Sequence, residues 1–206
     1  MKTTESKSSR PRGRPLSFDR DTVLERAMHV FWRKGYESTT IHDLTAAMGI
    51  TAPSLYAAFG DKEHLYLEAV ERYRSGPGEY ASCILARQCT AYNAVRELLI
   101  EACHKMADPD TPSGCMLVNS AAASEMCSQA IQDAIAECRQ TAETDLKTRI
   151  ERGIAEGDVP AHVDATQLAK FYVTVLTGMS IQSREGLDCA SMQAVIDSAM
   201  MAWPRT

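Results

Sequence analysis

Residues 39–65 contain two short segments with helical periodicity, one on each side of a glycine. In the first segment, apolar or small side chains recur every three or four residues, which predicts one buried stripe along a helix. These positions are Ile41, Leu44, Thr45 and Met48. Gly49 stands where the chain must reverse, and glycine tolerates the positive φ that such a turn needs. Thr40 is suited to cap this helix, because a threonine hydroxyl accepts a free backbone N–H of the first turn.

The segment after the glycine predicts a second helix with a small outward face. Thr51 is its expected N-cap, and Pro53 fits its first turn, where the missing N–H costs nothing. Leu55 faces inward, and Phe59 closes a small core. The expected outward positions are Thr51, Ala52, Ser54 and Tyr56.

A third helix is expected to start directly afterwards. Asp61 caps it, which leaves Lys62 at the helix N-terminus with its ammonium free to meet a phosphate. Two short helices, a glycine turn and an exposed lysine form the layout of a helix-turn-helix that docks into a DNA major groove. The alternative is a pair of packed helices without contact to DNA, since this geometry also occurs in enzymes.

The rest of the chain predicts helices and shows no convincing alternating strand. Stretches rich in proline and glycine at 75–78 and 108–114 separate the periodic segments. The expected helices outside the window cover about 19–34, 62–74, 79–88, 91–107, 115–124 and 128–156, followed by two final helices. The prediction is an all-α fold of about nine helices. It comprises an arm (1–15), a helix-turn-helix domain (16–74) and a second helical domain (75–206).

The two final helices carry apolar stripes at the spacing i, i+3, i+4, i+7, i+8 and i+11. The first stripe is Leu168, Phe171, Tyr172, Val175, Leu176 and Met179. The second is Met192, Val195, Ile196, Ala199, Met200 and Trp203. Such stripes must be buried, and packing inside one chain accounts for part of each.

The net charge of −5 divides unevenly along the 206 residues. Residues 1–75 hold 12 Lys/Arg and 10 Asp/Glu, whereas the remainder holds 10 and 17. The basic end includes Arg12 and Arg14 in a Pro-Arg-Gly-Arg-Pro segment, which resembles an arm that lays arginines into a narrow A/T-rich minor groove. The alternative is a disordered tail that aids solubility.

The order of residues in the 39–65 window resembles the DNA-binding domain of the TetR family of bacterial transcription regulators. Thr-Thr-Ile, Asp-Leu, Gly-Ile-Thr, Leu-Tyr, Phe and Asp-Lys-Glu follow one another in it. Upstream, Phe31-Trp32-Arg33-Lys34-Gly35-Tyr36 resembles the Phe-x-x-x-Gly-Tyr end of the family's first helix. The resemblance covers about residues 16–65. Thr45 stands where alanine is usual and Pro53 where a small residue is frequent, and these departures bear on which bases are read.

This resemblance implies a transcription regulator, most simply a repressor that a small-molecule effector releases from double-stranded operator DNA, although activation stays open. Thr51, Ala52, Pro53 and Ser54 are the expected contacts to base edges. Thr40, Tyr56 and Lys62 are the expected contacts to phosphates.

The family also pairs its last two long helices with their copies, and a two-fold homodimer suits a palindromic operator. The expected dimer interface is Leu168, Tyr172, Val175, Met179, Met192, Val195, Ile196 and Met200.

The middle helices are where the family holds its effector, which is unknown here. Candidate pocket residues are Tyr92, Met106, Met116, Asn119, Phe171, Tyr172 and Met179. Methionines and aromatics at helical spacing are more often plain core. Seven cysteines without a CxxC motif do not suggest a disulfide framework. Cys115 follows a Pro-Ser-Gly loop and opens an apolar helix, whose N-terminus can make a thiol reactive. It is either an oxidant or electrophile sensor or a structural residue.

The sequence gives little support to other classes of protein. A small helical enzyme would need a catalytic constellation, and we expect neither catalysis, a cofactor nor a metal site. No apolar run approaches the ~20 residues of a membrane helix, and no apolar segment follows the basic N-terminus, so we expect a cytoplasmic protein. An architectural DNA-binding protein without an effector is a further alternative; a solid second core would favour it, whereas a ligand-sized cavity would favour the regulator.

Overall fold

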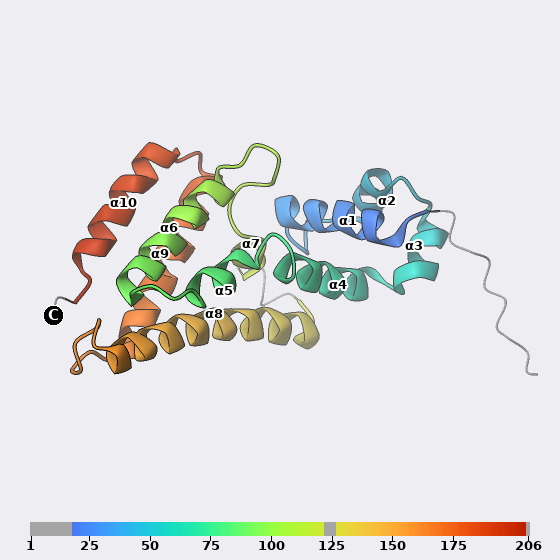
Figure 1. The fold of residues 1–206 in the computed structure, drawn as a ribbon. Helices are drawn as coiled ribbons and strands as arrows, with labels where there is room; N and C mark the ends of the chain where they lie inside the picture. The colour runs from blue at the N-terminus through green and yellow to red at the C-terminus, as the bar shows by residue number, and fades with distance from the viewer. Residues whose placement is uncertain (1–17, 122–126, 205–206) are drawn as a thin grey trace, which may run out of the picture.

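The computed structural model describes residues 18–121 and 127–204, and this part consists of α-helices without a strand. It contains ten helices, where about nine were expected (Figure 1). They are α1 (Arg20–Lys34), α2 (Ile41–Met48), α3 (Ala52–Phe59), α4 (Lys62–Arg74), α5 (Tyr80–Leu85), α6 (Ala91–Met106), α7 (Met116–Ala121), α8 (Gln129–Glu156), α9 (Ala165–Arg184) and α10 (Cys189–Met201). The all-α prediction is confirmed.

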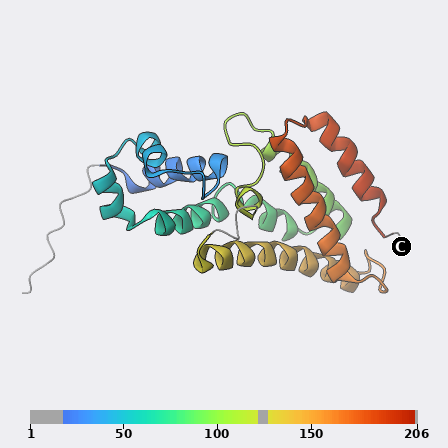
Figure 2. The same cartoon turned by 180° about the vertical axis from the view of Figure 1, so that it is seen from behind.

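The helices form an elongated molecule with two ends. Helices α1 to α4 make one end, and α6, α9 and α10 make the other (Figure 1). The view from behind shows α9 and α10 in front of α6 (Figure 2). The long helix α8 lies below α5 and α6 in the view of Figure 1 and reaches the near end of α4, and it packs most extensively against α9. None of the helices in the described ranges combines the length and the apolar character needed to cross a membrane.

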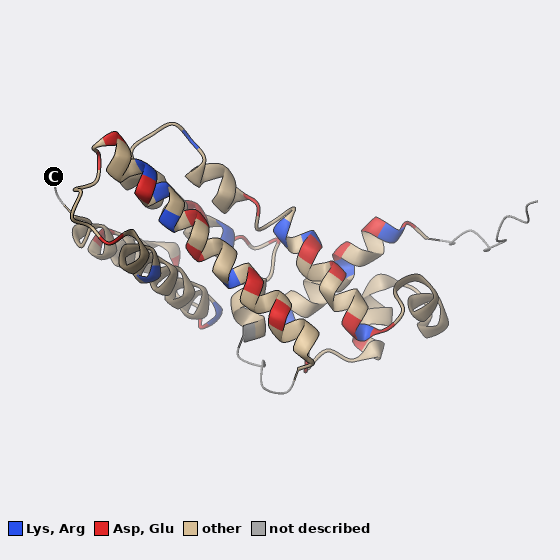
Figure 3. Ribbon diagram, turned by 90° about the horizontal axis from the view of Figure 1, so that it is seen from below, with Lys and Arg blue, Asp and Glu red and all other residues tan. Residues whose placement is uncertain are grey.

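The exposed face of the long helix α8 carries many charged side chains. Acidic and basic positions are interspersed along it (Figure 3). Lys147 pairs with Glu151 at 3.6 Å, and Arg152 pairs with Glu156 at 3.7 Å. Opposite charges four residues apart support an exposed helical face by a few tenths of a kcal/mol each.

The first hydrophobic core extends beyond the helix-turn-helix. Phe31 of α1 and Tyr66 of α4 meet edge to face at 5.0 Å between ring centroids, and both are buried. Buried residues of α7 and α8 join the same cluster, among them Met116, Ile131 and Ile135. The end formed by α1 to α4 therefore rests directly on the second half of the chain.

The second core lies among α5, α6, α8, α9 and α10. Its largest fully buried side chains include Leu98 and Leu99 of α6 and Tyr172 of α9. The Tyr172 hydroxyl donates a 3.1 Å hydrogen bond to the carbonyl of Ala199 on α10. This bond satisfies a polar atom that would be costly to bury alone.

A buried charge ties the far end of α8 to the start of α6. The Arg149 side chain is 1% exposed, and one of its Nη atoms lies 3.9 Å from an Asp158 carboxylate oxygen. That guanidinium also donates to the carbonyl of Cys89. The same Asp158 oxygen accepts the backbone N–H of Ala91 at 3.0 Å, at the first residue of α6. Asp158 thus joins the loop after α8 to the N-terminus of α6.

Candidate DNA interface and effector cavity

The start of α2 is closed by reciprocal hydrogen bonds. The Thr40 hydroxyl accepts the backbone N–H of Asp43 at 3.1 Å, and the Asp43 carboxylate accepts the Thr40 N–H at 3.0 Å. This capping box satisfies two backbone donors that the helix leaves unpaired. Lys34 at the end of α1 donates to the same carboxylate at 2.6 Å. The expected cap at Thr40 is present, and it is anchored to α1.

The Asp43 carboxylate should make the stability of this end depend on pH. The hydrogen bond from Lys34 lowers the pKa of Asp43 well below its ordinary value of 3.8, and the bonds with Thr40 add to this effect. A carboxylate with a depressed pKa contributes stability above its unfolded pKa and loses it as the pH falls through the folded pKa.

Asp43→Asn should therefore be less stable than wild type at pH 7 and at pH 4. The difference should shrink as the pH falls below 3.8, because the carboxyl of the unfolded wild-type chain takes up a proton there, whereas the folded carboxyl does so only at a lower pH. Urea denaturation at pH 7, 4 and 2 measures this difference. A difference of equal size at all three pH values would show that the lost charge is not the cause.

The turn between α2 and α3 needs glycine. Gly49 has φ 69° and ψ 31°, in the left-handed region that side chains rarely adopt, and its N–H donates to the Thr45 carbonyl at 3.0 Å. The Arg26 guanidinium of α1 reaches the carbonyl of Met48 at 3.4 Å. The C-terminus of α2 is thus fixed against α1, which sets the direction in which α3 leaves.

Helix α3 presents its small face outward as the sequence predicts. Leu55 is 0% exposed and Phe59 is also buried, whereas Tyr56 is 48% exposed. The Thr51 hydroxyl accepts the N–H of Ser54 at 3.4 Å and lies 3.0 Å from its hydroxyl. Of the remaining expected contacts, Pro53 is exposed and Ala52 is half-buried. The five expected contact residues of α3 and its N-cap lie together on one short surface.

The Lys62 ammonium lies at the start of α4, as expected, and also contacts an aromatic ring. Its Nζ lies 4.3 Å from the centroid of the Tyr36 ring, a cation–π contact that holds the side chain over the loop between α1 and α2. Such a contact leaves the ammonium donors available to an anion. Asp61 caps α4 by accepting the N–H of His64 at 2.8 Å, as expected. A hydrogen bond with Asp61 raises the pKa of His64.

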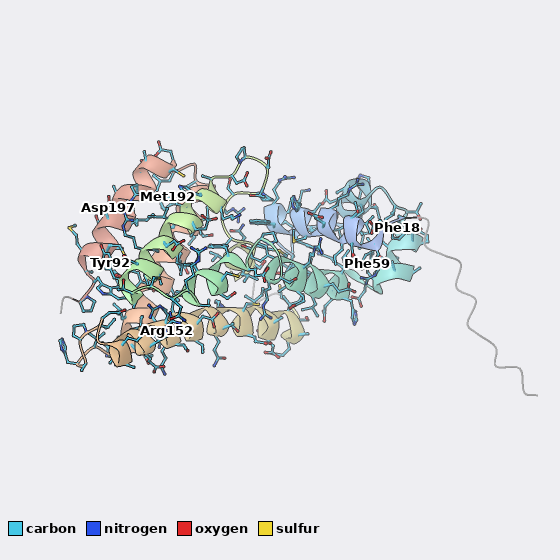
Figure 4. All side chains as sticks on the ribbon, viewed as in Figure 1. Phe18, Phe59, Tyr92, Arg152, Met192 and Asp197 are labelled. Atoms are coloured by element: carbon cyan, nitrogen blue, oxygen red, sulfur yellow. The ribbon has the colours of Figure 1, made fainter. Side chains whose placement is uncertain are left out.

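Two contacts that position this surface could not be predicted from the pattern of apolar and polar residues. Tyr36 orients Lys62, although its place in the chain indicates only the end of the first helix. Arg20 pairs with Glu68 of α4 at 2.7 Å and lies over the Phe59 ring at 4.4 Å. Figure 4 places Phe59 beside Phe18 at this end of the molecule. The expected minor-groove arginines, Arg12 and Arg14, lie outside the described residues.

A cavity of about 170 Å³ lies where the DNA-binding end meets the second half of the chain. Trp32 of α1 and Tyr73 of α4 form its wall on one side, and Tyr80, Met106 and Cys115 belong to the other. The remaining lining residues are Pro77, Lys105, Asp108, Thr111 and Gly114. Helices α1 and α4 therefore share one space with α5, α6 and the loop before α7.

The seven pocket candidates are not brought together. Met106 lines the cavity just described, whereas Tyr92 lines a separate open hollow with Arg96, Asp197 and Trp203. Figure 4 labels Tyr92 and Asp197 at the end of the molecule opposite Phe59. The other five line neither space. Met116, Tyr172 and Met179 are buried in the cores, Asn119 donates to the carbonyl of Trp32 at 3.1 Å, and Phe171 is 41% exposed on α9.

Most of the expected dimer stripe is used inside one chain. The members packed in the second core are Tyr172, Met179, Met192, Ile196 and Met200. Because these side chains are already covered, they offer no surface to a partner. Val195 is 43% exposed, and Leu168 and Val175 are half-buried. The apolar side chains left exposed on α9 and α10 include Phe171, Ile181 and Met201.

Known families match both halves of the chain. Residues 23–69 match the family described as bacterial regulatory proteins, tetR family. Residues 91–201 match the tetracyclin repressor-like C-terminal domain. The second match covers more than half of the chain and excludes an incidental helix-turn-helix on an unrelated body.

Two transcriptional repressors are similar to this chain over nearly its whole length. The HTH-type transcriptional repressor ComR of Escherichia coli (strain K12) is 31% identical over 194 residues, which cover 94% of this chain and 92% of ComR. The repressor BdcR of the same organism is 28% identical, with coverage of 95% and 93%.

A solved structure is closer in sequence than either repressor. A cysteine-substituted TetR family transcriptional regulator, CifR, bound to 26-base-pair operator DNA, superimposes with a TM-score of 0.87 at 40% identity. The match covers 93% of this chain and 100% of that one. The chain therefore belongs to the TetR family of bacterial transcription regulators.

Proposed function

We propose that this protein is a cytoplasmic repressor that leaves its operator when a small effector occupies the cavity between Trp32, Tyr73 and Cys115. The observation that carries the proposal is the shared wall, because α1 and α4 of the DNA-binding end line the same cavity as α5, α6 and the loop before α7. A ligand that fits one arrangement of this wall better than another shifts the equilibrium between them.

The reading surface supports sequence-specific binding in the major groove. Thr51, Ala52, Pro53 and Ser54 contact base edges in this proposal, with hydroxyls as hydrogen-bonding groups and apolar atoms for a thymine methyl. Thr40, Tyr56 and Lys62 contact phosphates and set the register. This surface is lightly charged, so the Arg12 and Arg14 arm supplements it in the neighbouring minor groove.

Hydrogen bonds connect the cavity to helices α1, α4 and α9. The Trp32 indole N–H donates to the Gly114 carbonyl at 3.1 Å, and the Tyr73 hydroxyl donates to the Cys115 Sγ at 3.4 Å. The backbone N–H of Cys115 in turn donates to the Ser180 hydroxyl of α9 at 2.8 Å. A shift of the 113–115 segment is thereby transmitted to α1, α4 and α9.

Gly114 makes this segment sensitive to small changes. It has φ 78°, and an added Cβ would lie 2.8 Å from the carbonyl oxygen of Ser180. The loop therefore lies too close to α9 to carry a side chain at this position without a shift. We infer that displacement of this loop is the step that couples the cavity to the spacing of the two reading heads.

The apolar face that remains exposed supports a homodimer on a palindromic operator. Phe171 and Ile181 of α9 and Val195 of α10 are large exposed apolar side chains. Gly178 lies between Phe171 and Ile181 in the sequence of α9, and a Cβ added at this position would meet open space. We propose that these residues, with the half-buried Leu168 and Val175, meet their copies across the two-fold axis.

Filling the cavity tests where the effector binds. Compounds are first screened for release of the purified protein from DNA that it selects. Thr111→Phe places a bulky ring at the cavity wall, and we expect normal DNA binding with at least a roughly tenfold higher effector concentration for release. The matched control, Arg96→Phe, changes a residue that lines the Tyr92 hollow and should respond like wild type. The opposite pattern would place the effector in the Tyr92 hollow.

A second candidate is covalent sensing at Cys115. The specific observation is that its half-buried side chain lines the cavity and accepts a hydrogen bond from Tyr73. An electrophile that enters the cavity would meet the thiol directly. We expect N-ethylmaleimide to modify Cys115 and release wild-type protein from DNA, whereas Cys115→Ser should stay bound. Equal release of both proteins would remove this candidate and leave reversible binding.

A further inference from the structure

Two further thiols, neither of which lines the proposed effector cavity, lie next to each other. Cys103, near the end of α6, and Cys189, the first residue of α10, have their Sγ atoms 3.1 Å apart. Each sulfur also faces the other residue's carbonyl oxygen, at 3.9 Å and 3.7 Å. No sequence motif links the two residues, because 86 positions separate them.

Both thiols are held by well-fixed elements. At the same end of α6 as Cys103, the Met106 carbonyl accepts a 2.8 Å hydrogen bond from the Ser183 hydroxyl of α9. Just before Cys189, the Asp188 side chain caps α10 by accepting the Ser191 N–H at 2.8 Å. Helices α6 and α10 also pack directly against each other. The two sulfurs therefore meet because the fold places them there.

We propose that Cys103 and Cys189 form a reversible disulfide that joins α6 to α10 when the protein meets a hydroperoxide. A disulfide needs a sulfur–sulfur distance of about 2.05 Å. The approach required is about 1 Å, which side-chain rotation on two packed helices can supply. This inference does not depend on the cavity or on the identity of the effector.

The oxidation of the two thiols needs only the hydroperoxide as oxidant. The Cys189 sulfur attacks one peroxide oxygen, the O–O bond breaks, and the alcohol (water, for hydrogen peroxide) leaves with a proton. The resulting sulfenic acid is attacked by the Cys103 sulfur, the S–S bond forms, and water leaves. Two thiols lose two electrons and two protons in total, and the hydroperoxide is reduced by two electrons.

Burial sets the order of these two attacks. Cys103 is 4% exposed, and burial raises the pKa of its thiol to about 12. Cys189 is half-buried at the start of α10 and is the sulfur that an oxidant can reach. Cys103 then acts as the resolving thiol, because it already lies next to the oxidised sulfur.

The crosslink would restrain the effector half of the molecule. It closes a long loop that includes α7, α8 and α9, and such closures stabilise mainly by restricting the unfolded chain. It also fixes the N-terminus of α10, whose exposed Val195 belongs to the proposed dimer face. We expect the oxidised protein to have a thermal midpoint roughly 5–10 °C higher.

Peptide mapping of the full-length protein tests the proposal. After brief treatment with hydrogen peroxide and blocking of the remaining thiols, we expect one crosslinked peptide that contains Cys103 and Cys189. We also expect a mass about 2 Da below that of the untreated chain, as two hydrogens are lost. Dithiothreitol should reverse both changes and the rise in thermal midpoint. Absence of the crosslinked peptide, or its assignment to another pair, overturns the proposal.

Matched variants separate this pair from the other cysteines. Cys103→Ser and Cys189→Ser should each lose the crosslink and the rise in thermal midpoint. Cys83→Ser, which changes an exposed cysteine on α5, should retain both. A Cys83→Ser protein that no longer forms the crosslink, or a Cys189→Ser protein that still stabilises on oxidation, contradicts the assignment.

Discussion

Leu55→Ala is expected to lower the free energy of unfolding by about 2–5 kcal/mol and to abolish sequence-specific DNA binding. Leu55 is fully buried and joins α3 to the first core. Its loss leaves a cavity beneath a helix of only eight residues, which has little stability of its own. Denaturant unfolding and DNA binding by the same preparation measure the two effects.

The neighbouring position supplies the control. Tyr56 is one residue further along α3 but points outward, so Tyr56→Ala should change stability by no more than about 0.5 kcal/mol. It should still weaken binding to all DNA sequences to a similar degree, because the lost contact is to a phosphate. If Leu55→Ala binds DNA as well as wild type, α3 is not the reading helix.

Asp158→Ala should lower the free energy of unfolding by about 3–5 kcal/mol, because it leaves the buried Arg149 guanidinium without its carboxylate. The change also removes the acceptor for the Ala91 N–H at the start of α6. Denaturant unfolding measures the loss.

An exposed carboxylate on α10 serves as the control for the stability effect of Asp158→Ala. Asp197→Ala on α10 should change stability by no more than about 0.5 kcal/mol. Replacing Asp158 and Arg149 together should cost less than the two single changes added, since the residues share one interaction. Strict additivity in this double-mutant cycle would show that the two charges do not stabilise each other.

The reading head was predictable because its signals are local. Thr40 and Thr51 cap helices that start one residue later, and Gly49 provides the left-handed turn between them. Each of these features depends on backbone geometry within four residues. The outward position of Tyr56 follows from helical periodicity alone.

The proposed dimer interface was less predictable, because periodicity does not distinguish packing against a partner from packing inside the same chain. Tyr172 and Ile196 lie on stripes that must be buried. In the structure both belong to the core formed by α6, α9 and α10 of the same chain. The surface left for a copy is displaced around α9, towards Phe171 and Ile181.

The cavity could not be predicted from neighbouring residues. Its walls combine Trp32, Tyr73 and Cys115, which are far apart in the sequence and meet only when α1 and α4 pack on the 113–115 segment. The pair Cys103 and Cys189 has the same origin. Sequence patterns describe helix faces, whereas these sites arise between faces of different helices.

Selection from a pool of random double-stranded DNA tests the central claim and assumes no particular operator sequence. Purified wild-type protein should enrich a palindromic sequence whose half-sites are separated by about one helical turn or a multiple of it. Thr51→Ala or Ser54→Ala should enrich an altered sequence, and Leu55→Ala should enrich none. If folded wild-type protein enriches no sequence at all, the account of a sequence-specific regulator is contradicted.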